Sequence, residues 1–121
     1  MKIGLDIMSG DNAPLSNING AIKYINNPQS KNNEIILYGN ENIIKNNTTL
    51  IKKYKKRISY IYTTNIVNMD DSPSTAFKNK RNSSLIKIID DLKLNKINAS
   101  VSSGNTGALL ASALLILGKI E

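Results

Sequence analysis

The sequence has 121 residues, 40% of them hydrophobic, and a formal net charge of +7. It contains no Cys and no His, which excludes disulfides, Cys-based zinc sites, Cys or His nucleophiles and a His general base. The length is that of one domain or less. A basic balance suits an anionic partner such as nucleic acid, a phosphorylated ligand, an acidic carrier protein or an anionic membrane. A coding bias toward Lys and Asn is an alternative explanation of this charge. The basic residues would then only form a solvated surface.

Strands and helices are predicted to alternate through the first half of the chain. Apolar residues recur at helical spacing after the first loop, and Pro28 ends that helix. Gly39 is expected to stop the second strand, and the second of two short helices is expected to turn Leu50, Ile51 and Tyr54 inward. The predicted elements are a strand at 2–7, a loop at 8–14, a helix at 15–25, a strand at 34–38, helices at 41–45 and 49–56, and a strand at 58–62.

The second half continues this alternation. Ser72 before Pro73 predicts an N-cap followed by a first-turn proline, and Asn82 or Ser83 is expected to cap the next helix. That helix should turn its apolar residues inward and Lys87, Asp90 and Asp91 outward. The predicted elements are a loop at 68–74, a short helix at 75–78, a helix to residue 92, a strand at 99–102, a turn at 103–107 and a helix at 108–117.

The last predicted helix is apolar on every side, which predicts that other elements enclose it. Its apolar run of 12 residues, 107–118, is shorter than the roughly 20 that span a bilayer. Asp6 also interrupts the N-terminal apolar run, so a signal peptide is not predicted and a cytoplasmic location is expected. The alternation predicts an α/β fold with a mainly parallel sheet. Four short strands offer little cover for such a helix, so residues 1–121 are interpreted as a truncated part of one domain.

The first motif is Asp6 together with residues 9–14 (SGDNAP), at the carboxyl end of the first strand. Ligands of open α/β sheets bind at such strand ends. Gly10 would let a ligand approach the backbone, and Asp6 and Asp11 offer carboxylates. An ordinary tight turn with an Asx cap explains the same residues. The pattern is not a G-x-G-x-x-G fingerprint, so dinucleotide binding is not predicted.

The second motif is residues 69–74 (MDDSPS), followed by Lys78, Lys80 and Arg81. Adjacent carboxylates do not face one point, so a paired-carboxylate site is not expected. The three basic residues near a capped helix start could hold phosphate by charge and by free N–H groups. N-capping with ordinary surface charge is the favoured local explanation.

The third motif is residues 102–107 (SSGNTG), between a strand and a helix. Small residues there leave backbone N–H groups free at the positive end of a helix, and hydroxyl and amide groups add donors, which is how an anion is held. The G-K-[ST] ending of an ATP-binding loop is absent, so ATP hydrolysis is not implied. A helix cap beside a tight packing turn is the alternative.

The three motifs, in this order and spacing, resemble the N-terminal third of the phosphate acyltransferases of bacterial phospholipid synthesis. The resemblance covers nearly the whole chain. The matching positions are Asp6, Gly10, Asp11 and Pro14; Asp71, Pro73, Ala76, Lys80, Ser83 and Ser84; and Ser103, Gly104, Asn105, Thr106 and Gly107. Two positions depart from the pattern. Ser9 replaces a usual glycine, which narrows the freedom of the backbone. Lys78 replaces an expected arginine, and lysine lacks the bidentate fork that arginine offers to phosphate.

The resemblance implies an enzyme that transfers an acyl group from acyl carrier protein to inorganic phosphate. It implies a three-layer, Rossmann-like or phosphotransacetylase-like fold, a homodimer, no metal or cofactor, and peripheral association with the inner face of the membrane. The product would go to a membrane glycerol-3-phosphate acyltransferase. The catalytic candidates are Asp6, Asp11 and Asn105. The candidates for binding substrate or phosphate are Gly10, Asn12, Lys78, Lys80, Arg81, Ser84, Ser103, Gly104, Thr106 and Gly107.

Two rival interpretations remain. A basic nucleic-acid module would need aromatic residues interleaved with the charge, but aromatics are 5% of the chain, so no nucleic acid is expected. An inactive fragment of the same family would have the same sequence features. We therefore expect residues 1–121 alone to be inactive and marginally stable. We also expect Asn105 to be replaceable by alanine at little cost in stability.

Overall fold

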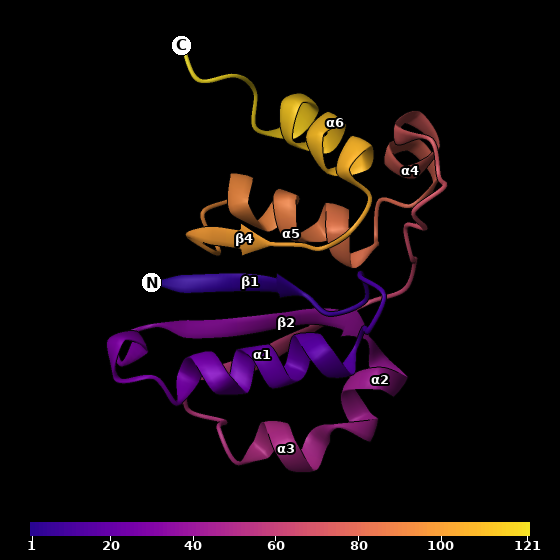
Figure 1. Cartoon of the computed structure of the whole chain (residues 1–121). Helices are drawn as coiled ribbons and strands as arrows, with labels where there is room; N and C mark the ends of the chain where they lie inside the picture. Colours follow the sequence, from indigo (N-terminus) through magenta and orange to yellow (C-terminus); the bar gives the residue numbers. More distant parts are fainter.

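The computed structural model describes all of residues 1–121 as a layered α/β structure (Figure 1). Its elements are β1 (Lys2–Asp6), α1 (Leu15–Ile25), a 3₁₀ turn η1 (Pro28–Ser30), β2 (Glu34–Asn40), α2 (Glu41–Asn46), α3 (Thr48–Lys52), β3 (Ile58–Thr63), α4 (Pro73–Asn79), α5 (Ser84–Lys93), β4 (Ala99–Val101) and α6 (Thr106–Ile116). The alternation predicted from the sequence is confirmed.

The sheet has four parallel strands in the order β3-β2-β1-β4. The chain moves outward from β1 to β2 and β3, then returns to place β4 on the other side of β1. The order of the strands therefore reverses between β1 and β4, and ligands of open α/β sheets bind beside such a reversal, at the carboxyl ends of the strands. The loops after β1 and β4 carry the first and third motifs.

Helices cover both faces of the sheet, because side chains alternate along each strand. Ile35 and Leu37 of β2 belong to a core cluster with residues of α1, α2 and α3. Tyr38 packs with Ile88 and Ile89 of α5 on the opposite face, where α6 adds further cover. The predicted three-layer α/β arrangement is confirmed, and Figure 1 shows α1–α3 and α4–α6 on opposite sides. The Rossmann-like description fits it coarsely.

The prediction that Gly39 stops the second strand was wrong. β2 runs on through Gly39 to Asn40. A Cβ at Gly39 would lie 2.6 Å from Cγ1 of Ile7, a distance that no real contact allows. Glycine is therefore needed here because the strand passes close to a buried side chain, and not because the strand ends.

The helix predicted at 49–56 is shorter. α3 ends at Lys52, and a turn fills residues 53–57. Ile51 is buried as predicted, whereas Leu50 is 42% exposed. Arg57 fixes the turn, since its guanidinium donates to the backbone carbonyls of Ile25, Asn33 and Ser30.

Asp91 is fully buried, although the helical pattern placed it on the outer face of α5. The hydroxyl of Tyr38 in β2 donates to Asp91 Oδ2 at 2.8 Å, and Lys87 Nζ donates to Oδ1 at 2.7 Å. Burial is the main cause that raises the pKa of Tyr38 far above its ordinary value, and the hydrogen bond to Asp91 raises it further. The outward prediction was wrong because periodicity does not reveal a polar partner on a distant strand.

α6 is not enclosed, which contradicts the prediction for this helix. Ala108 and Ser112 are buried, but Leu110, Leu114 and Leu115 are 60%, 45% and 66% exposed. They leave an apolar surface along the outer side of the helix. No helix of the chain is long and apolar enough to cross a bilayer.

Candidate functional site

The first and third motifs lie against each other at one edge of the sheet. Gly10 has a φ of 101°, and a Cβ there would lie 3.3 Å from Cβ of Ser103. A Cβ at Gly104 would lie 2.8 Å from Oγ of Ser9. The two turns can approach this closely because glycines occupy both. The prediction that Gly10 and Gly104 share an edge is confirmed.

Asp6 is fully buried at the end of β1 and connects three segments. Its Oδ2 accepts hydrogen bonds from the hydroxyls of Ser9 (2.5 Å) and Ser102 (2.8 Å). Its Oδ1 accepts from the hydroxyl of Ser84 (2.6 Å) and from the backbone N–H of Met8 (3.0 Å). Ser84 is the first residue of α5, so the positive end of that helix also faces the carboxylate. Both oxygens are thus engaged in holding the first motif, α5 and the third motif together.

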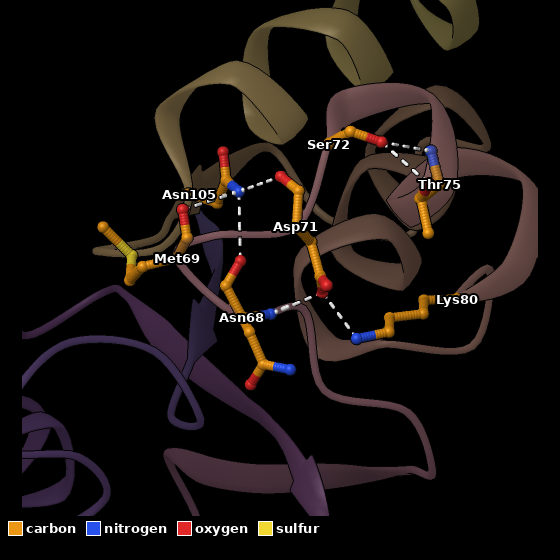
Figure 2. Close-up of polar contacts among 7 residues, drawn as sticks. All are labelled: Asn68, Met69, Asp71, Ser72, Thr75, Lys80 and Asn105. Carbon is orange, nitrogen blue, oxygen red and sulfur yellow. Dashed lines mark hydrogen bonds and ion pairs between the residues drawn. The ribbon is translucent and has the colours of Figure 1, made fainter.

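Asn105 joins the third motif to the second (Figure 2). Its Nδ2 donates to the backbone carbonyls of Asn68 (3.0 Å), Met69 (3.2 Å) and Asp71 (2.7 Å). Its Oδ1 accepts from the N–H of Ala108 at 3.0 Å and caps α6. The amide predicted to face a ligand is therefore used inside the fold. The expectation that alanine could replace it at little cost is contradicted by these four bonds.

Lys80 is held inside the second motif. Its ammonium forms an ion pair with Asp71, whose Oδ2 also accepts from the N–H of Asn68 at 2.8 Å (Figure 2). The hydrogen bond from Lys80, and then that from Asn68, lower the pKa of the Asp71 carboxyl. Ser72 caps α4 by accepting from the N–H of Thr75, as predicted.

The three basic residues of the second motif do not converge on one point. Arg81 pairs with Asp90 at 3.1 Å and lies over the ring of Phe77, with 4.5 Å from guanidinium carbon to ring centre. Lys78 is exposed and forms no ion pair. Of the three cations, Lys78 alone has an ammonium free of a carboxylate partner.

The start of α6 leaves backbone donors open to solvent. Asn105 supplies partners to the N–H groups of Ala108 and Leu109, whereas those of Thr106 and Gly107 donate to no group of the chain. Thr106, Gly107 and nearby Ser103 are all exposed. The first turn of a helix with free N–H groups attracts anions through its donors and its dipole. Gly107 also lets α4 approach, since a Cβ there would lie 3.1 Å from Pro73.

The other predicted residues of the first motif lie on the surface beside this site. Asp11 and Asn12 are exposed. The carbonyl of Asn12 accepts from the N–H of Ser16, which leads the loop into α1. Asp11 is thus the exposed carboxylate of the motif, while Asp6 is the buried one.

Ser9, Ser102 and Asn17 help to build the site and were not among the candidate site residues; Ser9 donates to Asp6. Ser102 orients Asp6 as described, and its Oγ also accepts from the N–H of Gly104. Asn17 of α1 donates to the carbonyls of Asp6 and Ser9, both at 3.0 Å. Ser102 belongs to the third motif and could have been suspected from it. No local pattern distinguishes Asn17 from the many other asparagines of the chain.

The sequence is similar to known proteins over its whole length. The family described as "Fatty acid synthesis protein" matches residues 1–121. The chain belongs to this family. Family members similar to it include the phosphate acyltransferases of Fusobacterium nucleatum (44% identical), Dictyoglomus thermophilum (40%) and Thermoanaerobacter pseudethanolicus (36%). The matches cover 100% of this chain and 36%, 35% and 35% of those relatives, respectively.

The chain thus spans about a third of the length of these family members. The resemblance first noted from three motifs is confirmed over all 121 residues. The motifs that carried it are the segments that Asp6 and Asn105 fasten together.

Proposed function

We propose that the protein takes part in acyl phosphate formation, in which an acyl group passes from the thioester of acyl carrier protein to inorganic phosphate. The observation that carries this proposal is the open positive end of α6 at the third motif. Relatives of the chain are named phosphate acyltransferase, and we take phosphate to be the acceptor. An exposed pair of N–H groups at a helix start is suited to holding it.

The reaction asks for positioning and charge stabilisation. A phosphate oxygen attacks the carbonyl carbon of the thioester and forms a tetrahedral oxyanion. The C–S bond then breaks, and the carrier leaves as a thiolate. Because the thiolate is a good leaving group, the protein must chiefly hold an anion against a carbonyl and stabilise the oxyanion.

The exposed groups at the site can be given roles in this scheme. The N–H groups of Thr106 and Gly107, with the hydroxyls of Thr106 and Ser103, bind phosphate oxygens. Lys78 contributes positive charge from α4, and Gly10 leaves room for the backbone to approach the substrate. Asp11 is the carboxylate with access to solvent. Asp6 and Asn105 act as positioning residues, because their polar atoms already have partners within the chain.

The resemblance also supplies a wider setting, which stays a prediction. It comprises a homodimer, an acidic carrier protein as donor, peripheral association with the membrane, and a membrane glycerol-3-phosphate acyltransferase that consumes the product. The basic surface predicted at Lys78, Lys80 and Arg81 would attract the carrier by charge chiefly through Lys78, since Lys80 and Arg81 are paired with Asp71 and Asp90. Salt screens such attraction over a Debye length of about 8 Å at physiological ionic strength.

A substitution at the first residue of α6 tests the anion site. Thr106→Pro removes one free N–H, and proline is favoured at this position of a helix, so the fold should persist. Thr106→Ala removes the hydroxyl but keeps the N–H. Phosphate binding, measured by NMR titration of the backbone amides, should weaken several-fold in Thr106→Pro and much less in Thr106→Ala.

Acyl transfer is then assayed with the substitutions made at the matching position of a full-length relative, by release of carrier thiol to a thiol-reactive dye, with and without phosphate. Phosphate-dependent release that falls in the variant matching Thr106→Pro supports the proposal. Phosphate binding that stays at the wild-type level in both variants would show that the start of α6 is only a capped turn. Phosphate binding by residues 1–121 without thiol release is the result expected of an inactive fragment.

A further inference from the structure

A groove of about 390 Å³ runs between α1 and the exposed face of β1 and β4. It lies on the face of the sheet opposite α5 and α6 and begins beside the third motif. Its lining residues share one helix face and the facing strands: Ser16, Asn17, Gly20, Ala21 and Tyr24 of α1, with Ile3, Leu5, Ile35, Val101 and Ser103.

The polarity of the groove changes along its length. Ser103 and Asn17 lie at the end next to the motifs, where Asn17 also bonds the carbonyls of Asp6 and Ser9. Leu5, Val101 and Ala21 line the middle, and Ile3 lies toward the amino end of its strand. The groove therefore has a polar mouth and an apolar body, which matches a molecule with a polar head and a hydrocarbon tail.

Gly20 gives the groove its width. A Cβ at Gly20 would meet no heavy atom within 4 Å. Packing therefore does not require glycine here, and glycine is unfavourable inside a helix compared with alanine. The absence of a side chain at this position leaves open the space that a larger residue would fill.

We propose that this groove binds the fatty acyl chain of the substrate, with the thioester carbonyl at Ser103 and the hydrocarbon along α1 toward Tyr24. This inference rests on the proposed function, since it places the chain of the acyl donor beside the proposed phosphate site. From Asn17 to Tyr24 the helix advances roughly 10 Å. A chain longer than that would leave the groove beyond Tyr24.

The occupant is argued from continuity and polarity. A chain whose carbonyl lies at the third motif can enter this groove directly, because Ser103 belongs to both. No charged side chain lines the groove, so a hydrocarbon meets no desolvated charge. A polypeptide segment covering the same face is the competing occupant, and the experiment below distinguishes the two.

The test uses cis-parinaric acid, a fluorescent fatty acid, titrated into the intact 121-residue chain below the concentration at which the probe aggregates. Gly20→Leu should weaken binding about tenfold or more, because the leucine side chain takes the place of the hydrocarbon. Asn19→Leu is the matched control, because Asn19 is exposed on the same helix and does not line the groove. Circular dichroism checks that both variants fold.

A second variant guards against a helix-wide effect of Gly20→Leu. Val101 is 50% exposed, so Val101→Asp should fold while placing a carboxylate in the groove, and it should also weaken the probe strongly. Equal binding by the wild type, Gly20→Leu and Val101→Asp would overturn the proposal. An absence of saturable binding to the wild type would do the same and would favour a polypeptide occupant.

The outcome is separable from that of the proposed function. Phosphate titration of Gly20→Leu should match the wild type, because Gly20 does not touch the third motif. Loss of probe binding with unchanged phosphate binding locates the acyl groove. If Thr106→Pro leaves phosphate binding unaltered, the proposed phosphate site is wrong. Binding of the probe to the wild type, lost in Gly20→Leu, would still support the groove.

Discussion

Ser102 and Asp6 are 96 residues apart in the chain and are joined by a hydrogen bond of 2.8 Å from hydroxyl to carboxylate. The bond links the ends of two neighbouring parallel strands, β1 and β4, at the point where the order of the strands reverses. Because Ser9 and Ser84 donate to the same carboxylate, one buried side chain fixes the relative positions of two motifs and the start of α5. The geometry of the proposed phosphate site therefore depends on a residue that need not touch phosphate.

Asp6→Asn should lower both stability and phosphate affinity. Asparagine keeps only one acceptor oxygen in place of the two of aspartate. At least one of the four donors therefore loses its partner or must rotate. A buried unsatisfied donor costs about 1–3 kcal/mol, and we expect a loss of that size in the free energy of unfolding measured with urea. Ser102→Ala is the smaller, matched change and should cost about 1 kcal/mol.

The same variants separate positioning from general base catalysis. If Asp6 positions the loops, Ser102→Ala should weaken phosphate binding in the same direction as Asp6→Asn. If Asp6 were a general base, Asp6→Asn would abolish transfer while phosphate affinity stayed unchanged. That second result would contradict the role assigned here.

Asn105→Ala should be among the more destabilising substitutions in the chain. It removes the N-cap of α6 and the donor shared by three carbonyls of the second motif, a combined loss of about 2–4 kcal/mol. Asn105→Asp keeps an acceptor for the cap but sets a carboxylate against those carbonyls. Amide hydrogen exchange should then show a protected α6 and a faster-exchanging second motif in Asn105→Asp. Exchange in residues 68–71 that matches the wild type would argue against the clamp.

Stability should depend on the charge of Asp71 in the acid range. Its pKa is lowered in the folded protein, chiefly by Lys80, so the folded state favours the ionised form. The resulting stabilisation is present above the pKa of an unfolded aspartate, about 3.9, and is lost as pH falls through the folded value. The difference in unfolding free energy between the wild type and Asp71→Asn should therefore be constant near pH 6 and shrink below about pH 4.

Asp70→Asn is the control for this pH dependence. Asp70 is the exposed neighbour of Asp71 and forms no ion pair or hydrogen bond through its side chain. Its replacement should leave the pH profile of stability close to that of the wild type. A profile for Asp71→Asn that runs parallel to the wild type at every pH would show that the pair with Lys80 contributes nothing.

The sequence was sufficient to predict the α/β class, because Ile and Leu periodicity and the turn residues act locally. The cap at Ser72, the cap at Asn82 or Ser83 (it is Ser83), and the shared sheet edge of Gly10 and Gly104 also followed from local rules and from the parallel sheet. The outward placement of Asp91 was wrong because its partner, Tyr38, lies on a strand far away in the sequence. Asn105 was predicted to face a ligand, but its amide donates to backbone carbonyls of the second motif. The sequence could not show this, because no side-chain pattern reveals a partner that is a backbone carbonyl.

The exposed face of α6 should make the isolated chain associate with itself. Leu110, Leu114 and Leu115 are exposed apolar residues within about one and a half turns of α6, and exposed apolar surface causes association when nothing covers it. Sedimentation velocity of residues 1–121 should show species that grow with concentration. A triple variant with glutamine at these positions should be monomeric and lose little stability, since exposed substitutions usually change it by within about 0.5 kcal/mol each.

Leu109→Gln is the matched control for the leucine surface. Leu109 is partly buried and packs against core clusters that include residues of α5, so a polar group there should destabilise the fold by about 2 kcal/mol or more.

The triple variant and the wild type should both fail to form acyl phosphate alone, because residues 1–121 leave the groove and the start of α6 open to water, which competes for every donor. A wild-type chain that is monomeric at all concentrations, unfolds cooperatively and forms acyl phosphate would contradict both expectations.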